Sequence, residues 1–201
     1  MAVPISVGEY FYEIRNAGGV VATEEGRVSA SEVIATRATA DGFNRYDVEA
    51  ALNGEGTVHR LSLRYSSSLF KRNAHYEAQD DNFRGSVSAV AGRNEVVIKL
   101  GRFREVDAAG MVLFRAIIID HVRRRNQIRW TGRVATIDAN SLVAVSLKHN
   151  CRRLDEAGLR WSYEPRMGDA EEIELDKAGR IQYRRDNRGV QTTLVSFNPA
   201  G

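Results

Sequence analysis

The sequence predicts a mainly β fold: an antiparallel meander of about a dozen strands, curled into a half-barrel or barrel, with one apolar helical segment at about 110–125. Three observations predict it. Apolar and polar residues alternate with a period of two from end to end. Turn-forming residues interrupt this alternation every ~8–12 residues. One segment breaks the rhythm, because Gly110–Arg125 is apolar on almost all sides.

The first half of the chain carries eight of the expected strands. Asp41-Gly42 and Asn53–Gly56 are strong turn signals between them. Gly26 interrupts a strand pattern and indicates a bulge or bend. Ser66–Lys71 fits either a short helical turn or a strand crossover. The expected strands are Tyr10–Ile14, Val20–Val28, Glu32–Thr39, Phe43–Leu52, Thr57–Tyr65, Ala74–Ala78, Phe83–Val90 and Val96–Leu100.

The second half continues the pattern after residue 127. Asp176–Gly179 and Asp186–Gly189 are expected to close the last two hairpins. A parallel sheet would need helical crossovers, and the spacing leaves no room for them, so the sheet is expected to be mostly antiparallel. The expected strands are Ile128–Ile137, Leu142–His149, Leu159–Tyr163, Glu171–Leu175, Arg180–Arg184 and Val190–Phe197.

The apolar segment favours a helix, although its isoleucine run also suits a buried strand. Val112, Ala116, Ile119 and Val122 fall on one helical stripe. Arginines follow at positions 123–125, where the dipole of a helix favours cations. Arg115 interrupts the apolar run, so its charge must be paired, reach solvent or face a polar ligand.

Length and composition favour one soluble domain over residues 1–201. No apolar run of about 18 residues exists, so the chain is not expected to span a membrane. The 25 arginines greatly outnumber the 4 lysines, but 26 acids disperse the charge to a net +3. Nucleic acid is therefore not an expected partner. The compartment stays open: cytoplasmic if the chain is complete, periplasmic or envelope if a leader was removed.

No catalytic, cofactor-binding or metal-binding motif is recognisable, so no catalytic residue, cofactor or metal is expected. His149 and Cys151 share a face of one expected strand. A thiol beside an imidazole is typical of an activated nucleophile and of part of a zinc site. The alternative is a buried thiol near a strand-end histidine.

Two hairpin patterns carry a family resemblance. The opening Phe11–Thr23 and the late turn Ile173–Arg180 resemble hairpins of bacterial envelope proteins with a half-barrel fold. That family type carries lipids or lipoproteins. The resemblance implies a curled sheet around a central apolar helix, and no lipid-attachment cysteine stands near the start of this chain.

The first functional hypothesis is a noncatalytic carrier of a lipid or other apolar ligand in the concavity of the curled sheet. Arg115, or an arginine from Arg123–Arg125, would hold an anionic head group. The alternatives are an enzyme at the barrel mouth, using His121, His149 or Cys151, and an assembly protein associating through sheet edges or an apolar face. The oligomeric state is left open. The candidate ligand-binding residues are Arg115, His121, Trp130, Trp161 and Tyr163.

Overall fold

The computed structural model describes residues 6–89, 92–100, 105–166 and 168–200. Strands account for most of them, and the only helix among them is α1 (Val112–Arg124). The strands are β1 (Gly8–Asn16), β2 (Gly19–Val28), β3 (Glu32–Thr39), β4 (Asn44–Leu52), β5 (Val58–Ser67), β6 (Lys71–Gln79), β7 (Asn82–Ala89), β8 (Gly92–Lys99), β9 (Glu105–Ala108), β10 (Arg129–Ile137), β11 (Ala144–Arg153), β12 (Arg160–Pro165), β13 (Glu171–Leu175), β14 (Ile181–Asp186) and β15 (Gln191–Pro199).

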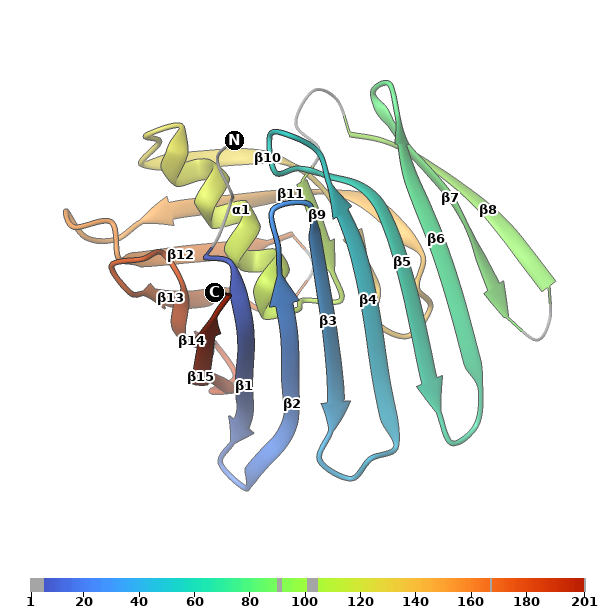
Figure 1. The fold of residues 1–201 in the computed structure, drawn as a ribbon, viewed down its shortest axis with the longest axis horizontal. Helices are drawn as coiled ribbons and strands as arrows, with labels where there is room; N and C mark the ends of the chain where they lie inside the picture. Colours follow the sequence, from blue (N-terminus) through green and yellow to red (C-terminus); the bar gives the residue numbers. More distant parts are fainter. Residues whose placement is uncertain (1–5, 90–91, 101–104, 167, 201) are drawn as a thin grey trace.

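All the strands of the described residues belong to one curled, unclosed sheet (Figure 1). Its order is β8-β7-β6-β5-β4-β3-β2-β1-β15-β14-β13-β12-β11-β10-β9. The first and last strands of the chain pair in the middle of the sheet, while β8 and β9 are its two edges. The predicted fold class, a mainly β meander curled into an incomplete barrel with one helix, is confirmed.

The sheet is mostly antiparallel as expected, but the expectation that the chain has no room for a helical crossover is wrong at one edge. The short strand β9 runs parallel to β10, and α1 provides the crossover between them. Sequence reasoning missed β9 because its four residues, Glu105-Val106-Asp107-Ala108, alternate over too short a run to stand out, and its two acids are buried. The segment expected to be a helical turn or crossover, Ser66–Lys71, instead joins β5 and β6 in a hairpin.

The expected turns form for the reasons that their side chains suggest. The Asn53 carboxamide oxygen accepts hydrogen bonds from the backbone N–H groups of Glu55 and Thr57. The Asp176 carboxylate accepts one from the backbone N–H of Arg180, and the turn closes at Gly179, whose φ is 86°. Such local bonds satisfy backbone donors that the strands leave unpaired, and they fix the hairpin positions.

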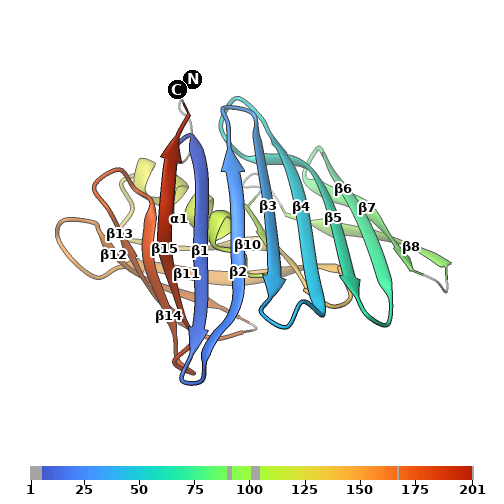
Figure 2. The same cartoon turned by 60° about the horizontal axis from the view of Figure 1, so that its bottom comes forward.

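The helix α1 fills the concave side of the sheet. Figures 1 and 2 show it between the β1–β3 side of the sheet and the strands β10–β13. Ten of its thirteen residues are buried. The apolar ones join the side chains of the inner sheet face in one continuous core cluster. Burial of a large apolar side chain contributes roughly 1.5–3 kcal/mol, so this segment stabilises the curled sheet.

Gly26 has a different role from the expected bulge. The β1–β2 register passes through Gly26 without a shift, and the irregularity lies between Ile14 and Arg15. A Cβ atom at Gly26 would lie 2.2 Å from Leu113 Cδ1 of α1. The glycine therefore allows the close approach of the helix to the sheet.

No helix in the described residues is long and apolar enough to cross a bilayer.

Candidate functional site: a charged cluster around the helix and a polar groove outside the sheet

The first turn of α1 is capped by a side chain from the sheet. The N-cap residue, Met111, makes no side-chain cap hydrogen bond. Instead Glu24 of β2, which is fully buried, accepts hydrogen bonds from the N–H groups of Val112 at 2.8 Å and Leu113 at 3.3 Å. Its other carboxylate oxygen pairs with Arg37 at 2.7 Å. A carboxylate at a helix N-terminus accepts hydrogen bonds from backbone N–H groups that have no partner within the helix, and its negative charge is attracted to the positive end of the helix dipole.

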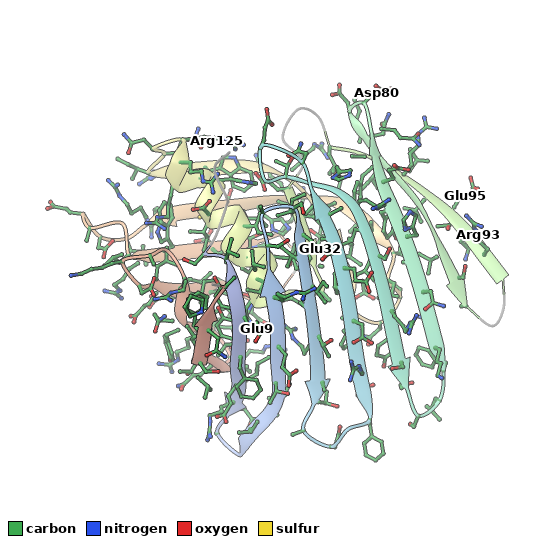
Figure 3. All side chains as sticks on the ribbon, viewed as in Figure 1. Glu9, Glu32, Asp80, Arg93, Glu95 and Arg125 are labelled. Carbon is green, nitrogen blue, oxygen red and sulfur yellow. The ribbon has the colours of Figure 1, made fainter. Side chains whose placement is uncertain are left out.

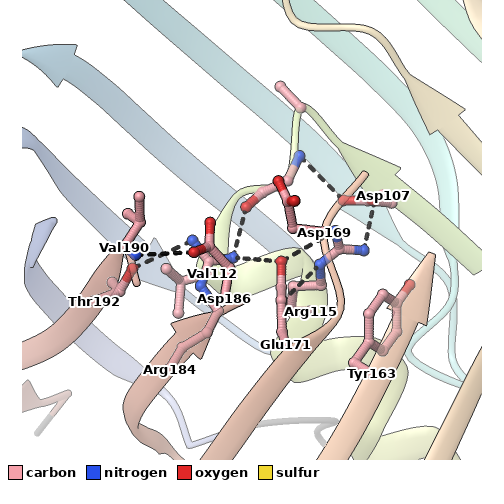
Figure 4. A network of polar contacts seen from close by, with 12 residues as sticks. Asp107, Val112, Arg115, Tyr163, Asp169, Glu171, Arg184, Asp186, Val190 and Thr192 are labelled. Atoms are coloured by element: carbon pink, nitrogen blue, oxygen red, sulfur yellow. Dashed lines mark hydrogen bonds and ion pairs between the residues drawn. The ribbon is translucent and has the colours of Figure 1, made fainter. Parts of the chain in front are cut away.

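Arg115 forms ion pairs with buried acids and does not point into an open cavity. Its Nη1 lies 2.6 Å from Asp107 Oδ2, and its Nε lies 3.4 Å from Glu171 Oε2 (Figure 4). The guanidinium also lies over the Tyr163 ring, 4.2 Å from the centroid. Burial lowers the pKa of Arg115, but Asp107, Tyr163 and Glu171 outweigh it, so that the pKa is raised and the group stays charged.

Arg184 connects this pair to the start of the helix. Its guanidinium lies 3.5 Å from Glu171, and it donates hydrogen bonds to the Gly110 carbonyl at 2.9 Å and to Thr192. We call the six charged residues that surround the helix start the helix-anchoring cluster. Its charges balance as three acids and three arginines: Glu24, Asp107, Glu171, Arg37, Arg115 and Arg184.

His149 and Tyr163 form a buried polar chain behind Arg115. His149 Nδ1 lies 2.5 Å from the Tyr163 hydroxyl, and His149 Nε2 lies 2.8 Å from Thr136 Oγ1. Burial lowers the pKa of His149 to about 4, with a further contribution from the positive charge of Arg115. The imidazole is therefore neutral at pH 7, with one ring nitrogen donating and the other accepting.

The environment of Cys151 disfavours the thiolate that a nucleophilic cysteine needs. The side chain is buried, and burial raises the pKa of its thiol to about 12. A reactive cysteine needs a lowered pKa so that thiolate is present at neutral pH. The shared strand face of His149 and Cys151 therefore does not favour nucleophilic catalysis.

His121 lies in the last turn of α1 and holds the other end of the helix. Its Nδ1 lies 2.9 Å from Glu105 Oε2 of β9, and both residues are buried. Asp120 and Arg124, one turn apart, form an ion pair at 2.7 Å, so adjacent Asp120 and His121 have separate partners. Both ends of the helix are thus tied to the sheet by ionisable groups.

The structure brings two of the five candidate ligand-binding residues together, Arg115 and Tyr163. Trp161 lies two residues before Tyr163 on the buried face of β12, and its Nε1–H donates to the Gly158 carbonyl at 2.9 Å. Trp130 lies on β10, opposite Cys151, with its ring against Gly132. His121 has the separate partner described above.

A polar groove lies on the opposite, outer face of the sheet. It has a volume of about 620 Å³ and spans strands β3 to β8. The pairing register aligns one row of its side chains straight across four neighbouring strands: Arg64 of β5, Asn73 of β6, Ser88 of β7 and Arg93 of β8. We call this hollow the outer groove.

A second row runs beside the first. It consists of Ser62, His75 and Ser86, with a 3.1 Å contact between Ser62 Oγ and His75 Nδ1. Glu49 lies at one end of this row and Glu95 at the other. The small serine side chains leave the groove open, and the two rows together present hydroxyl, amide, imidazole and guanidinium groups.

The charges of the outer groove are only partly matched within the chain. Asp47 accepts hydrogen bonds from Thr36 at 2.8 Å and from Arg45 at 2.9 Å. Its pKa is lowered, because these bonds and the positive charges of Arg45 and Arg64 outweigh its partial burial. Among the described residues, neither Arg64 nor Arg93 forms an ion pair. Exposed Arg64, opposite Asp47, and exposed Arg93 thus lie on either side of the neutral donors Asn73 and Ser88.

Sequence reasoning missed the outer groove. Its members are spread over six strands, and only the register places them in rows. The available signal was the recurrence of Ser, Asn and His between buried residues, as in Ser86-Val87-Ser88, which by itself is typical of any solvated sheet face.

Two solved structures are similar to this chain. One is a β-barrel-like protein of the domain of unknown function DUF1849 from Brucella abortus, with a TM-score of 0.63, 10% identity and full coverage of both chains. The other is a DUF1089-family protein from Pseudomonas aeruginosa, with a TM-score of 0.59, 16% identity and coverage of 80% of this chain and 87% of that one. No protein-family model matches the sequence, and no curated protein matches it significantly. The chain therefore shares the architecture of β-barrel-like proteins of unknown function.

Proposed function

We propose that the protein is a noncatalytic binding protein that holds an anionic ligand in the outer groove. The observation that carries the proposal is the row of Arg64, Asn73, Ser88 and Arg93 across four strands of a hollow of about 620 Å³. Guanidinium groups bind phosphate and sulfate through paired N–H donors, and hydroxyl and amide groups complete the coordination of such oxygens.

The spacing of the row points to a ligand with two anionic groups. Neighbouring strands lie about 4.8 Å apart, so Arg64 and Arg93 stand about 14 Å apart at the backbone across three spacings. Each long side chain can lean toward the centre of the row, over Asn73 and Ser88. A diphosphate, or two sulfates on one molecule, would contact both guanidinium groups at once.

Titration calorimetry with inorganic pyrophosphate tests the proposal. Arg64→Ala and Arg93→Ala should each weaken binding at least about tenfold, because charged hydrogen bonds contribute roughly 1.5–3 kcal/mol. The matched control is Arg84→Ala, an exposed arginine on the outer face of β7 in a row outside the groove. It should leave binding within about twofold. Absence of pyrophosphate binding, or equal losses in all three variants, would remove the proposal.

The lipid-carrier hypothesis puts the ligand on the concave side instead. An apolar ligand there would compete with α1, which buries ten of its thirteen residues and is tied by ionisable groups at both ends. Native mass spectrometry of protein purified from its own host separates the two proposals. A retained lipid would favour the carrier, whereas a retained phosphorylated or sulfated molecule lost in Arg64→Ala would favour the outer groove.

A further inference from the structure

The two edges of the sheet differ in accessibility. The edge strand β9 has four residues, all buried. The edge strand β8 is twice as long, and Figures 1 and 2 show it as the outermost strand of its half of the sheet. Its outer-face residues Arg93, Glu95, Val97 and Lys99 are exposed, Val97 to 58% (Figure 3 labels two of them). Such an edge presents backbone donors and acceptors that a further strand can pair with.

A second copy of the chain would have to satisfy a strict register. If two copies of β8 pair antiparallel about a two-fold axis perpendicular to the sheet, opposed residues lie on the same face and one residue faces itself. With Glu95 at the axis, two carboxylates would be opposed. With Val96 at the axis, Arg93 would face Lys99 of the partner subunit. Both registers place like charges together, which destabilises a strand pair.

The register centred on Val97 is complementary on both faces. On the outer face, Glu95 of each copy opposes the partner's Lys99, and Val97 meets its own counterpart. On the inner face, the half-buried Val96 opposes the partner's Ile98. Opposite charges and β-branched side chains in directly opposed positions each stabilise a sheet.

We propose that two copies of this chain associate through β8 in the register centred on Val97, which continues the sheet from one subunit into the other. The mode is strand addition at an exposed edge. Charged residues on an edge strand also serve to prevent pairing, and charges of one sign do so against any partner. The charges of β8 instead alternate in a way that fits a second copy. The inference does not depend on the ligand of the outer groove.

A charge-swap experiment tests the pairing, with the dimer dissociation constant measured by sedimentation over a concentration series. Glu95→Lys and Lys99→Glu each place like charges opposite one another at two symmetric positions, so each should weaken the dimer at least about tenfold. Mixing the two variants should restore association, because every opposed pair across the heterodimer is again attractive. The double variant should also associate like the original chain. Both positions are exposed, so circular dichroism should show an intact fold.

A cross-link measures the register directly. Val97→Cys places two thiols across the axis, where opposed Cα atoms lie about 4.5–5.5 Å apart, within the range of a disulfide. The control Asn94→Cys separates the two thiols by six residues, or about 20 Å, so it should not cross-link. The native Cys151 is buried and does not interfere. A monomer at every concentration, equal cross-linking of both variants, or charge variants that dimerise like the original chain would each overturn the proposal.

Discussion

The two faces of the sheet use arginine in opposite ways. On the concave side, the arginines of the helix-anchoring cluster are buried or half-buried, and each is paired with an acid. On the outer face, exposed Arg64 stands between Asp47 and Asn73, and exposed Arg93 stands beside Ser88, and neither forms an ion pair among the described residues. A matched buried charge costs desolvation and fixes one geometry, whereas an exposed cation next to neutral donors keeps its capacity for an external anion. The charges of the cluster are therefore satisfied within the chain, whereas the exposed arginines of the groove are the basis of the ligand proposal.

The largest effect should come from breaking the cluster. Arg115→Leu leaves Asp107 without its ion-pair partner in a buried site, so the free energy of unfolding should fall by about 3–5 kcal/mol. Urea unfolding measures this change, and Arg84→Leu on the outer face is the matched control. If Arg115→Leu changed stability no more than the control, the cluster would not hold the helix.

Lowering the pH should destabilise the folded protein through protonation of His149 on the concave side. Its pKa is lowered from 6.5 to about 4 in the folded protein, so the unfolded chain binds more protons between these values. Stability from this group is fully present above pH 6.5 and is lost as the pH falls toward 4, by about 3 kcal/mol in all.

His149→Gln should remove that part of the pH dependence, which appears as a shallower slope of unfolding free energy against pH between about 6.5 and 4. The exposed His75→Gln on the outer face is its control and should leave the slope unchanged. A slope unaltered by His149→Gln would show that this imidazole does not titrate as its burial requires.

Removal of the helix cap that Glu24 provides should cause the next largest loss of folding stability. Glu24→Gln keeps the shape of the side chain but removes the negative charge that pairs with Arg37 and stabilises the positive end of the helix dipole. We expect the free energy of unfolding to fall by about 2 kcal/mol. Thermal unfolding followed by circular dichroism provides the measurement, and the exposed Glu49→Gln serves for comparison. Similar small changes in both variants would argue against a capping role.

Substitution of Cys151 is expected to change the properties of the protein least. Because its thiol is buried and its pKa is raised to about 12, native protein should react slowly with thiol reagents. Cys151→Ser should change pyrophosphate affinity less than about threefold. Fast labelling of the folded protein, or a larger loss of affinity, would return the enzyme hypothesis to consideration.

Much of the fold could be predicted because local chemistry determines it. Turns such as Asn53–Gly56 and Asp176–Gly179 form through their own side chains, and the expected helix lies within one or two residues of the observed α1. The parallel strand β9 and the partners of Arg115 depend on contacts between distant segments. Asp107 and Glu171 carry no signal in the sequence that assigns them to Arg115. The single-domain prediction stays a prediction, and one cooperative calorimetric transition is its expected result.

The most direct test of the contrast between the two faces is a nuclear magnetic resonance titration of the protein with inorganic pyrophosphate. We expect the backbone amide signals that shift to belong to the outer groove, around Arg64, Asn73, Ser88 and Arg93. The signals of Asp107, Arg115 and Glu171 should stay in place, because their charges are already paired. Shifts of signals around Arg115, with the signals of the outer groove unchanged, would show that the anion binds on the concave side instead.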